Sequence, residues 1–230
     1  MEKLIPLLMC IIFIAIAFCL WKAAIKISSF AARRKILSYS RASASAVSVL
    51  LISYFGDSAV LPNVYLPCRT TKGVVYTDID NIIVFPTCIV VVEVKSMNGQ
   101  IFTGKGDKWH QSLKNKNGET AELDFENPIL KNERNTQILT AILEKEKLPV
   151  PPIHNIVMFS TDKVVFSEEF SEVYKLSAAI EKMKMLSKGK RFSRKEQRHY
   201  IKIINKYSTS AAEARAHNAN IRKKTEKTVK

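Results

Sequence analysis

The most regular apolar run of the chain ends in two charged residues. Residues 88–95 read CIVVVEVK, a length and composition typical of a buried strand. Alternate residues of a strand point to the same face, so Glu93 and Lys95 share one face and the valines beside them line the other. Buried charges are costly unless they are paired, hydrogen-bonded or bound to a metal. The pattern therefore predicts either a functional site or an internal ion pair.

Hydrophobic periodicity and turn residues predict a chain of mixed helices and strands. Asn127 and Pro128 are residue types of a helix N-cap and first helical position, and LPVPP at 148–152 ends that helix. The predicted elements are a helix at 38–55, an extended segment at 60–67, strands at 72–77, 79–85, 88–95 and 101–104, a polar loop at 105–126, a helix at 127–147, strands at 154–160 and 163–166, a helix at 168–186 and a helical tail at 187–230.

The strands before and after residues 86–87 are predicted to form a tight antiparallel hairpin. A two-residue turn places Asp80 opposite Glu93, with Cβ atoms about 5 Å apart. The same register places Asp78 opposite Lys95. A loop one residue longer would put the two carboxylates on opposite faces of the sheet. The geometry of the candidate site therefore depends on this turn.

Two carboxylates at this distance repel each other unless positive charge lies between them. A hard divalent ion such as Mg²⁺, bound by one or two carboxylates with water and phosphate oxygens, supplies that charge. It would also help to ionise an attacking water, while Lys95 would orient the water or neutralise the phosphate. These features outline a phosphodiesterase site. The alternative is a structural ion pair of Lys95 with Glu93 or Asp78.

Longer motifs around these residues resemble the nuclease-related domain (NERD) family of the PD-(D/E)XK nuclease superfamily. The similar segments read YTDIDNIIV, IVVVEVKSMNGQIF, KWHQ and ENPILKNERN. They lie within residues 76–139 of a resemblance that covers about residues 40–160. The resemblance implies an α/β fold with a restriction-endonuclease-like αβββαβ core, which we place at residues 38–186.

The same resemblance implies roles for individual residues. Asp80 and Glu93 would bind a Mg²⁺ or Mn²⁺ cofactor, and Lys95 would be the catalytic lysine. Gln111 corresponds to the glutamine of a W-x-Q motif and would contact substrate or water. The helix start at Asn127 matches a motif whose expected role is capping and packing.

The chain departs from the family pattern at three places. Its first predicted helix reads SASAVS where the family often has a glutamate that completes the metal site. Asn81 stands where the family has histidine, and Lys131 and Asn135 replace a glutamine and a histidine of the helix-start motif. The missing acid leaves two alternatives open, an active nuclease and a catalytically degenerate nuclease fold.

The N-terminal residues predict a membrane anchor. Residues 4–21 carry no charge and are long enough for one membrane-spanning helix. Lysine and arginine follow this span, and positive charge stays on the cytoplasmic side. We therefore expect a single-pass anchor at 1–22, a basic linker at 23–37 and a domain that faces the cytoplasm at the cell membrane; a secretory signal peptide is the competing interpretation. The four cysteines, without CxxC spacing, fit free thiols in a reducing compartment.

Most of the excess positive charge lies at the C-terminal end. The formal net charge is +15, and residues 178–230 hold 16 Lys and Arg against 4 Asp and Glu. Such a segment favours contact with the phosphates of nucleic acid or with anionic lipid head groups. Trp109 would either stack on a base or cap the edge of the core. The predicted nucleic-acid contacts are Trp109, Lys188, Lys190, Arg191, Arg194, Lys195 and Arg198.

Together these features predict a membrane-anchored, metal-dependent endonuclease that hydrolyses DNA on the cytoplasmic side. Its architecture would be an N-terminal transmembrane helix, the nuclease-like α/β domain and a basic helical tail at 187–230. The alternative is a degenerate nuclease fold that binds nucleic acid, or anionic lipid, at the membrane.

Overall fold

The computed structural model describes residues 42–71, 73–114 and 120–228. The chain from Ser43 onward forms one compact unit. No helix of this described part is both long enough and apolar enough to cross a membrane. The predicted anchor at 1–22 and the linker that follows it lie outside the described residues.

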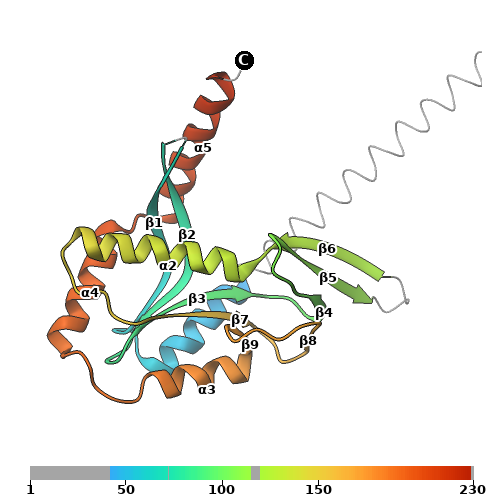
Figure 1. Ribbon diagram of the computed structural model, residues 1–230, viewed down its shortest axis with the longest axis horizontal. Coiled ribbons are helices and arrows are strands. Elements are labelled where there is room, and N and C mark those ends of the chain that lie inside the picture. Colours follow the sequence, from blue (N-terminus) through green and yellow to red (C-terminus); the bar gives the residue numbers. More distant parts are fainter. Residues whose placement is uncertain (1–41, 72, 115–119, 229–230) are drawn as a thin grey trace, which may run out of the picture. The chain divides into compact units, whose positions relative to one another are not determined.

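A five-stranded mixed sheet forms the centre of the unit (Figure 1), with strand order β1-β2-β3-β7-β9. The first three strands are antiparallel neighbours, whereas β3, β7 and β9 run parallel to one another. The strands are β1 (Val60–Thr70), β2 (Gly73–Val84), β3 (Ile89–Lys95), β7 (Ile153–Phe159) and β9 (Val173–Lys175).

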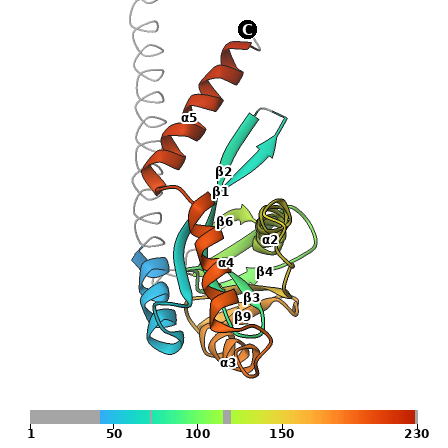
Figure 2. The same cartoon turned by 90° about the vertical axis from the view of Figure 1, so that its left-hand side faces the viewer.

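Helices cover both faces of this sheet. The helix at residues 42–55 and α3 (Leu176–Leu186) pack on one face, against alternate valines of β3. On the other face lie α2 (Pro128–Lys145) and α4 (Arg194–Tyr207). Figure 2 shows the 42–55 helix and α2 on opposite sides of the sheet. Because β3 is covered on both faces, it reads as an almost continuous apolar run.

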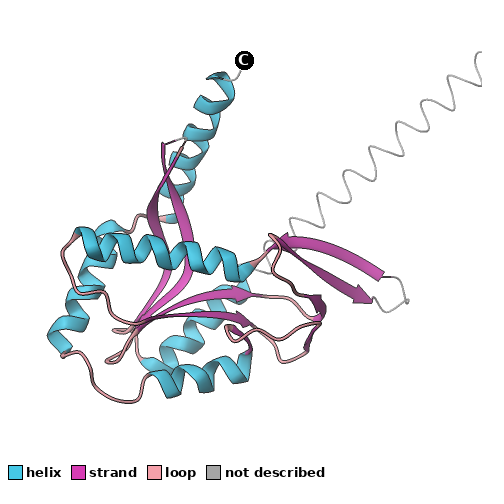
Figure 3. Ribbon diagram, viewed as in Figure 1, coloured by secondary structure: helices cyan, strands magenta, loops and turns pink. Residues whose placement is uncertain are grey.

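The predicted αβββαβ order is present, with a second sheet inserted into it. The 42–55 helix, β1, β2, β3, α2 and β7 follow one another in this order. Between β3 and α2 the chain forms β4 (Gly99–Phe102), β5 (Lys108–Lys114) and β6 (Thr120–Glu126), which Figure 3 shows in magenta. With β8 (Val164–Phe166) they make a sheet of order β6-β5-β4-β8. The prediction of a polar loop at residues 105–126 is therefore wrong.

The basic C-terminal region belongs to the folded unit and is not a separate tail. A capping box of Ser193 and Glu196 begins α4. Tyr200 and Ile204 of this helix are buried in the core between the sheet and α2. A last helix, α5 (Ala211–Thr228), follows. The predicted division between domain and tail is thus not a boundary of the fold.

Two other predicted elements differ in extent. The helix predicted at 168–186 begins only at Leu176, because the three residues before it pair with β7 as β9. The strands predicted at 72–77 and 79–85 are one continuous strand, β2, which is paired with β1 along most of its length.

The first half of β2 has an open edge that α5 covers. On this side β3 pairs only with residues 81–84 of β2. Asn218 of α5 replaces the missing strand at Tyr76, since its amide accepts from the Tyr76 N–H and donates to the Tyr76 carbonyl, both at 2.8 Å. Nε2 of His217 donates to the carbonyl of Val74 at 2.9 Å. These side chains protect an edge that would otherwise offer free backbone groups to another strand.

We expect Asn218→Ala to lower the free energy of unfolding by about 1–2 kcal/mol, because it leaves two backbone groups of Tyr76 without their partner. Urea denaturation of the full-length chain measures this change. The control is Asn220→Ala, an exposed asparagine of the same helix, which should change stability by less than about 0.5 kcal/mol. Equal effects of the two changes would mean that Asn218 acts only through helix propensity.

Candidate active site

Asp80, Glu93 and Lys95, which we call the trio, lie where β2 and β3 separate. The predicted hairpin register is confirmed as far as Asn81, which pairs with Val92. Beyond that pair the backbone ladder ends. The carboxylate of Asp80 replaces the next backbone hydrogen bond, since its Oδ2 accepts from the N–H of Val94 at 2.7 Å. The hairpin thereby fixes the Asp80 side chain against the end of β3.

Glu93 is 2% exposed and interacts with two lysines. Nζ of Lys95 lies 2.7 Å from Oε1 of Glu93. Nζ of Lys131, on α2, lies 2.8 Å from Oε2 and 3.1 Å from Oε1 of Glu93. Lys131 also lies 2.9 Å from Oδ2 of Asp78. Together with Asp80, the site therefore contains three carboxylates and two ammonium groups.

Asp78 does not pair with Lys95, and this part of the prediction is wrong. The β2–β3 ladder stops before Asp78, which lies opposite Tyr65 of β1 instead. Its side chain contacts Lys131. Partial loss of hydration opposes ionisation of Asp78, but the attraction of Lys131 outweighs it and lowers the pKa of this carboxyl.

The pKa values of Asp80 and Lys131 are both raised, for different reasons. Burial, and then the negative charge of Glu93, raise the pKa of Asp80 to about 6. For Lys131, burial opposes the charged form, but Glu93 and Asp78 outweigh burial and raise its pKa above the ordinary value. Two neighbouring carboxylates thus repel each other, and a lysine is held charged beside them.

Lys131 is a charged residue of the candidate site that the sequence reasoning did not place there. The sequence showed it only as a departure from the helix-start motif. Asn132 fixes this turn of α2, because it is fully buried and its Nδ2 donates to the carbonyl of Val91 at 2.9 Å. The predicted capping role of Asn127 is present, since its side chain accepts from the N–H of Ile129 at 3.0 Å. The helix start therefore positions the ammonium of Lys131 over β3.

Gln111 and Trp109 are buried side chains of β5. Nε2 of Gln111 donates to the carbonyl of Asn98 at 2.8 Å and so holds the turn after β3. Trp109 is 1% exposed, and its Nε1 donates to the carbonyl of Gly104 at 2.8 Å. A buried indole is not accessible to a nucleobase. Its position agrees with the alternative in which Trp109 caps the core edge.

Asn81 occupies the position where the family pattern has histidine. It is fully buried, and its side-chain amide has no hydrogen-bond partner among the described residues. No acidic residue of the described 42–55 helix stands near its start, as the sequence indicated. At both places the chain therefore lacks an ionisable side chain that the family pattern has. Both places lie on the face of the sheet opposite α2.

The predicted phosphate-binding residues of the C-terminal region lie away from the trio. The N–H groups of Arg191 and Phe192 both donate to the carbonyl of Pro86 at 2.8 Å, so this segment lies at the hairpin turn before β3. Glu93 and Lys95 of the trio lie four and six residue steps along β3 from Ile89, or about 13 and 20 Å. Six exposed residues, which we call the basic segment, have no ion-pair partner in the described part of the chain: Lys188, Lys190, Arg191, Arg194, Lys195 and Arg198.

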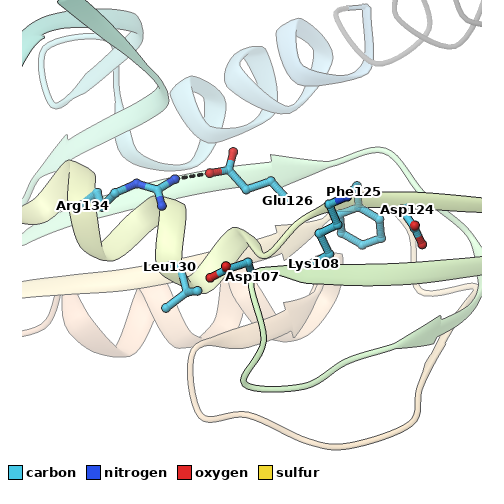
Figure 4. A pocket seen from close by; sticks show the side chains of 7 residues that line it. All are labelled: Asp107, Lys108, Asp124, Phe125, Glu126, Leu130 and Arg134. Carbon is cyan, nitrogen blue, oxygen red and sulfur yellow. Dashed lines mark hydrogen bonds and ion pairs between the residues drawn. The ribbon is translucent and has the colours of Figure 1, made fainter. Parts of the chain in front are cut away.

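A pocket of about 430 Å³ is lined by residues of β5, β6 and the first turns of α2 (Figure 4), and one of these residues lies near the trio. Phe125 connects the two, because its ring centroid is 5.9 Å from Nζ of Lys95. Arg134 of α2 forms an ion pair with Glu126 at the pocket. The pocket therefore offers mixed charges beside the lysine of the site. Its lining residues are Asp107, Lys108, Asp124, Phe125, Glu126, Leu130 and Arg134.

Comparison with known proteins gives one match. The sequence model of the nuclease-related domain (NERD) matches residues 42–160, a segment that includes the trio, Lys131 and the second sheet's β4, β5 and β6. This match is consistent with the PD-(D/E)XK nuclease superfamily. No curated protein and no solved structure matches the chain.

Proposed function

Since this chain belongs to the nuclease-related domain family, we propose that it is an endonuclease that hydrolyses DNA phosphodiester bonds with the help of a divalent cation. The observation that supports this proposal is the arrangement of Asp80, Glu93 and Lys95 at the separation of β2 and β3. Two strands of the central sheet position the three side chains, so their geometry is set by backbone pairing.

The residues of the trio fit one hard divalent cation. Mg²⁺ usually takes one or two protein carboxylates and completes its shell with water and phosphate oxygens. Asp80 and Glu93 supply the carboxylates. Burial, and then the charge of Glu93, raise the pKa of Asp80, and a bound cation would offset both effects. Among the described residues no group of three or more His, Cys, Asp or Glu side chains is arranged to hold a metal. Bound there, Mg²⁺ or Mn²⁺ would stabilise negative charge on the phosphate and lower the pKa of water.

Lys95 has the geometry of a group that acts on the reacting phosphate. The ammonium of Lys95 lies 2.7 Å from Oε1 of Glu93, and the Lys95 side chain is 18% exposed. The same ammonium lies 5.9 Å from the ring centroid of Phe125, a residue that lines the pocket. A charged donor fixed in this way would orient water or stabilise charge that develops on a phosphate oxygen.

The test is cleavage of plasmid and single-stranded DNA by the full-length chain with Mg²⁺, with Mn²⁺ and with EDTA. We expect cutting with either ion and none with EDTA. Asp80→Asn should abolish most of this cutting, because it removes one carboxylate ligand. Asp57→Asn, which changes an exposed acid outside the site, is the matched control. Cutting in EDTA, or equal cutting by the two variants, would contradict the proposal.

A second candidate function is a degenerate nuclease fold that binds nucleic acid without cutting it. The observation that favours it is Lys131, whose ammonium already neutralises the carboxylates. DNA binding by the wild-type chain, with no cleavage under any of the ionic conditions above, is the result that would select this alternative. In either case we propose that the domain acts at the cytoplasmic side of the cell membrane, anchored by residues 1–22.

We propose that the basic segment contacts the phosphates of DNA. Each of its exposed charges that meets a phosphate releases counterions, so binding weakens as salt rises. Changing Lys188, Lys190 and Arg191 together to Gln should reduce the slope of log affinity against log salt by about 2–3. Fluorescence anisotropy with labelled duplex DNA measures the slope. An unchanged slope, together with lost binding to anionic vesicles, would assign the segment to lipid instead.

A further inference from the structure

We propose that Lys131 is an internal cation of the site and competes with the divalent ion for Glu93. This inference rests on the proposed cation site at Asp80 and Glu93. Nζ of Lys131 contacts both oxygens of Glu93, at 2.8 and 3.1 Å, and Oδ2 of Asp78 at 2.9 Å. One ammonium thus bridges two carboxylates, as a metal ion does.

Both oxygens of Glu93 already contact an ammonium group. A carboxylate oxygen has about two lone-pair sites. Oε1 of Glu93 already meets Lys95 at 2.7 Å and Lys131 at 3.1 Å, and Oε2 meets Lys131 at 2.8 Å. Because Glu93 is 2% exposed, an ion cannot approach it from an open solvent side. Oε2 keeps an unused lone pair, but an ion that approaches it meets the ammonium of Lys131. A divalent ion is therefore repelled at Glu93 and binds more tightly when this ammonium moves away.

Lys131 is the ammonium that can leave at the lower cost. When it gives up Glu93, it keeps Asp78, a side chain that is 58% exposed and faces solvent. Lys95 has no other carboxylate within ion-pair distance among the described residues. Displacement of Lys131 thus costs one of its two carboxylate partners, whereas displacement of Lys95 costs its only one.

The position of Lys131 is built into the fold. Its neighbour Asn132 is fully buried and bonded to the backbone of β3. One turn further along α2, Nδ2 of Asn135 donates to the carbonyl of Asp78 at 3.2 Å, and its Oδ1 accepts from Thr77 at 2.8 Å. Because these contacts lock α2 onto β2 and β3, only the side chain of Lys131 needs to move. The divalent ion thus competes with the ammonium of Lys131 for Glu93, so a higher concentration of the ion is needed to occupy the site.

The test measures Mn²⁺ binding to the full-length chain without DNA, by isothermal titration calorimetry and by the loss of the free-Mn²⁺ signal in electron paramagnetic resonance. Lys131→Gln should bind Mn²⁺ roughly tenfold more tightly or better, because one opposing unit charge is removed. Lys131→Arg, which keeps the charge, should bind like the wild type. Lys145→Gln removes an exposed charge from the same helix and should also bind like the wild type.

Two results would overturn the inference. One is a Lys131→Gln variant that binds Mn²⁺ no more tightly than the wild type; the other is an equal gain in Lys131→Arg. If Lys131→Gln does not fold, the wild type provides a second measurement: the Nζ signal of Lys131 in ¹H–¹⁵N spectra, assigned with Lys131→Arg, should shift as Mg²⁺ is added. A signal that stays fixed while Mg²⁺ saturates the protein also overturns it.

The binding measurement separates this inference from the proposed function. A chain that shows the expected Mn²⁺ affinities and cuts no DNA keeps the role of Lys131 and contradicts the nuclease. A chain that cuts DNA while Lys131→Gln gains no affinity keeps the nuclease and contradicts the role of Lys131.

Discussion

Replacing Lys95 with alanine is expected to lower the rate of DNA cleavage by about 10²–10³-fold, the cost of removing one fixed donor to a charged transition state. The fold should survive the change. Glu93 keeps Lys131 as a partner, at 2.8 Å, so no buried carboxylate is left without a positive charge. The loss in free energy of unfolding should therefore stay well below the 3–5 kcal/mol that is typical when a buried charge is left without any partner.

Single-turnover cleavage at saturating Mg²⁺ and urea denaturation of the same preparations measure the two effects of Lys95→Ala. Lys145→Ala is the control, since it removes an exposed lysine of α2 that does not contact the trio. Cleavage by Lys95→Ala at the rate of this control would show that Lys95 has no catalytic role.

Glu93→Ala is a poorer test of catalysis, because its effect on stability is expected to be large. It removes the shared partner of Lys95 and Lys131. Removing one side of a buried charge cluster typically costs 3–5 kcal/mol. Loss of cleavage in this variant would therefore report unfolding as well as chemistry. The Lys95→Ala variant separates loss of catalysis from loss of stability, whereas the Glu93→Ala variant does not.

Trp109→Ala is expected to destabilise the protein by about 3–5 kcal/mol, the usual cost of emptying a large buried site. Trp109 is 1% exposed and lies in the core of the second sheet. Its ring packs at centroid distances of 6.2 Å from Phe125 and 5.9 Å from Phe170. The change also leaves the carbonyl of Gly104 without the indole donor.

Urea denaturation measures the loss of stability in Trp109→Ala. Phe102→Ala is the control, because this aromatic residue of the same sheet is 42% exposed and should cost much less. Trp109→Phe should bind DNA as the wild type does. A Trp109→Phe variant with normal stability and weakened DNA binding would instead support the base-stacking role.

The parts of the fold that sequence predicted correctly rest on local signals. The register of the β2–β3 hairpin follows from a two-residue turn, so Asn81 could be placed opposite Val92 without knowledge of the rest of the fold. The start of α2 follows from an asparagine cap before a proline, and the structure has that cap. In both cases the deciding residues are neighbours in sequence.

Two strands of the second sheet, β4 and β8, were predicted, whereas β5 and β6 were missed because one buried position of β5 is polar. In β5 the alternating residues Trp109 and Gln111 are both buried. A glutamine at a buried position hides the period-two pattern that indicates a strand. Its burial is possible only because Asn98, in another segment, accepts its hydrogen bond. Such a compensation depends on tertiary structure.

Lys131 and α4 were misjudged for a related reason. Lys131 meets Glu93 across 38 residues of sequence, through the docking of α2 on the sheet. No local pattern contains that contact. In α4 the many charges suggested a solvated tail, whereas Tyr200, Ile203 and Ile204 form a buried stripe on one side of the helix. Net charge describes partners and solubility and does not exclude a helix from the core.

The cover that α5 provides for β2 also sets an order of events during synthesis. Tyr76 leaves the ribosome long before Asn218, which is 142 residues further along the chain. At 5–20 residues per second this interval lasts about 7–30 s. Throughout it the edge of β2 lacks its final partner and can pair with a strand of another nascent chain. Chaperones are therefore expected to hold chains that stop before α5, and to release those that complete it.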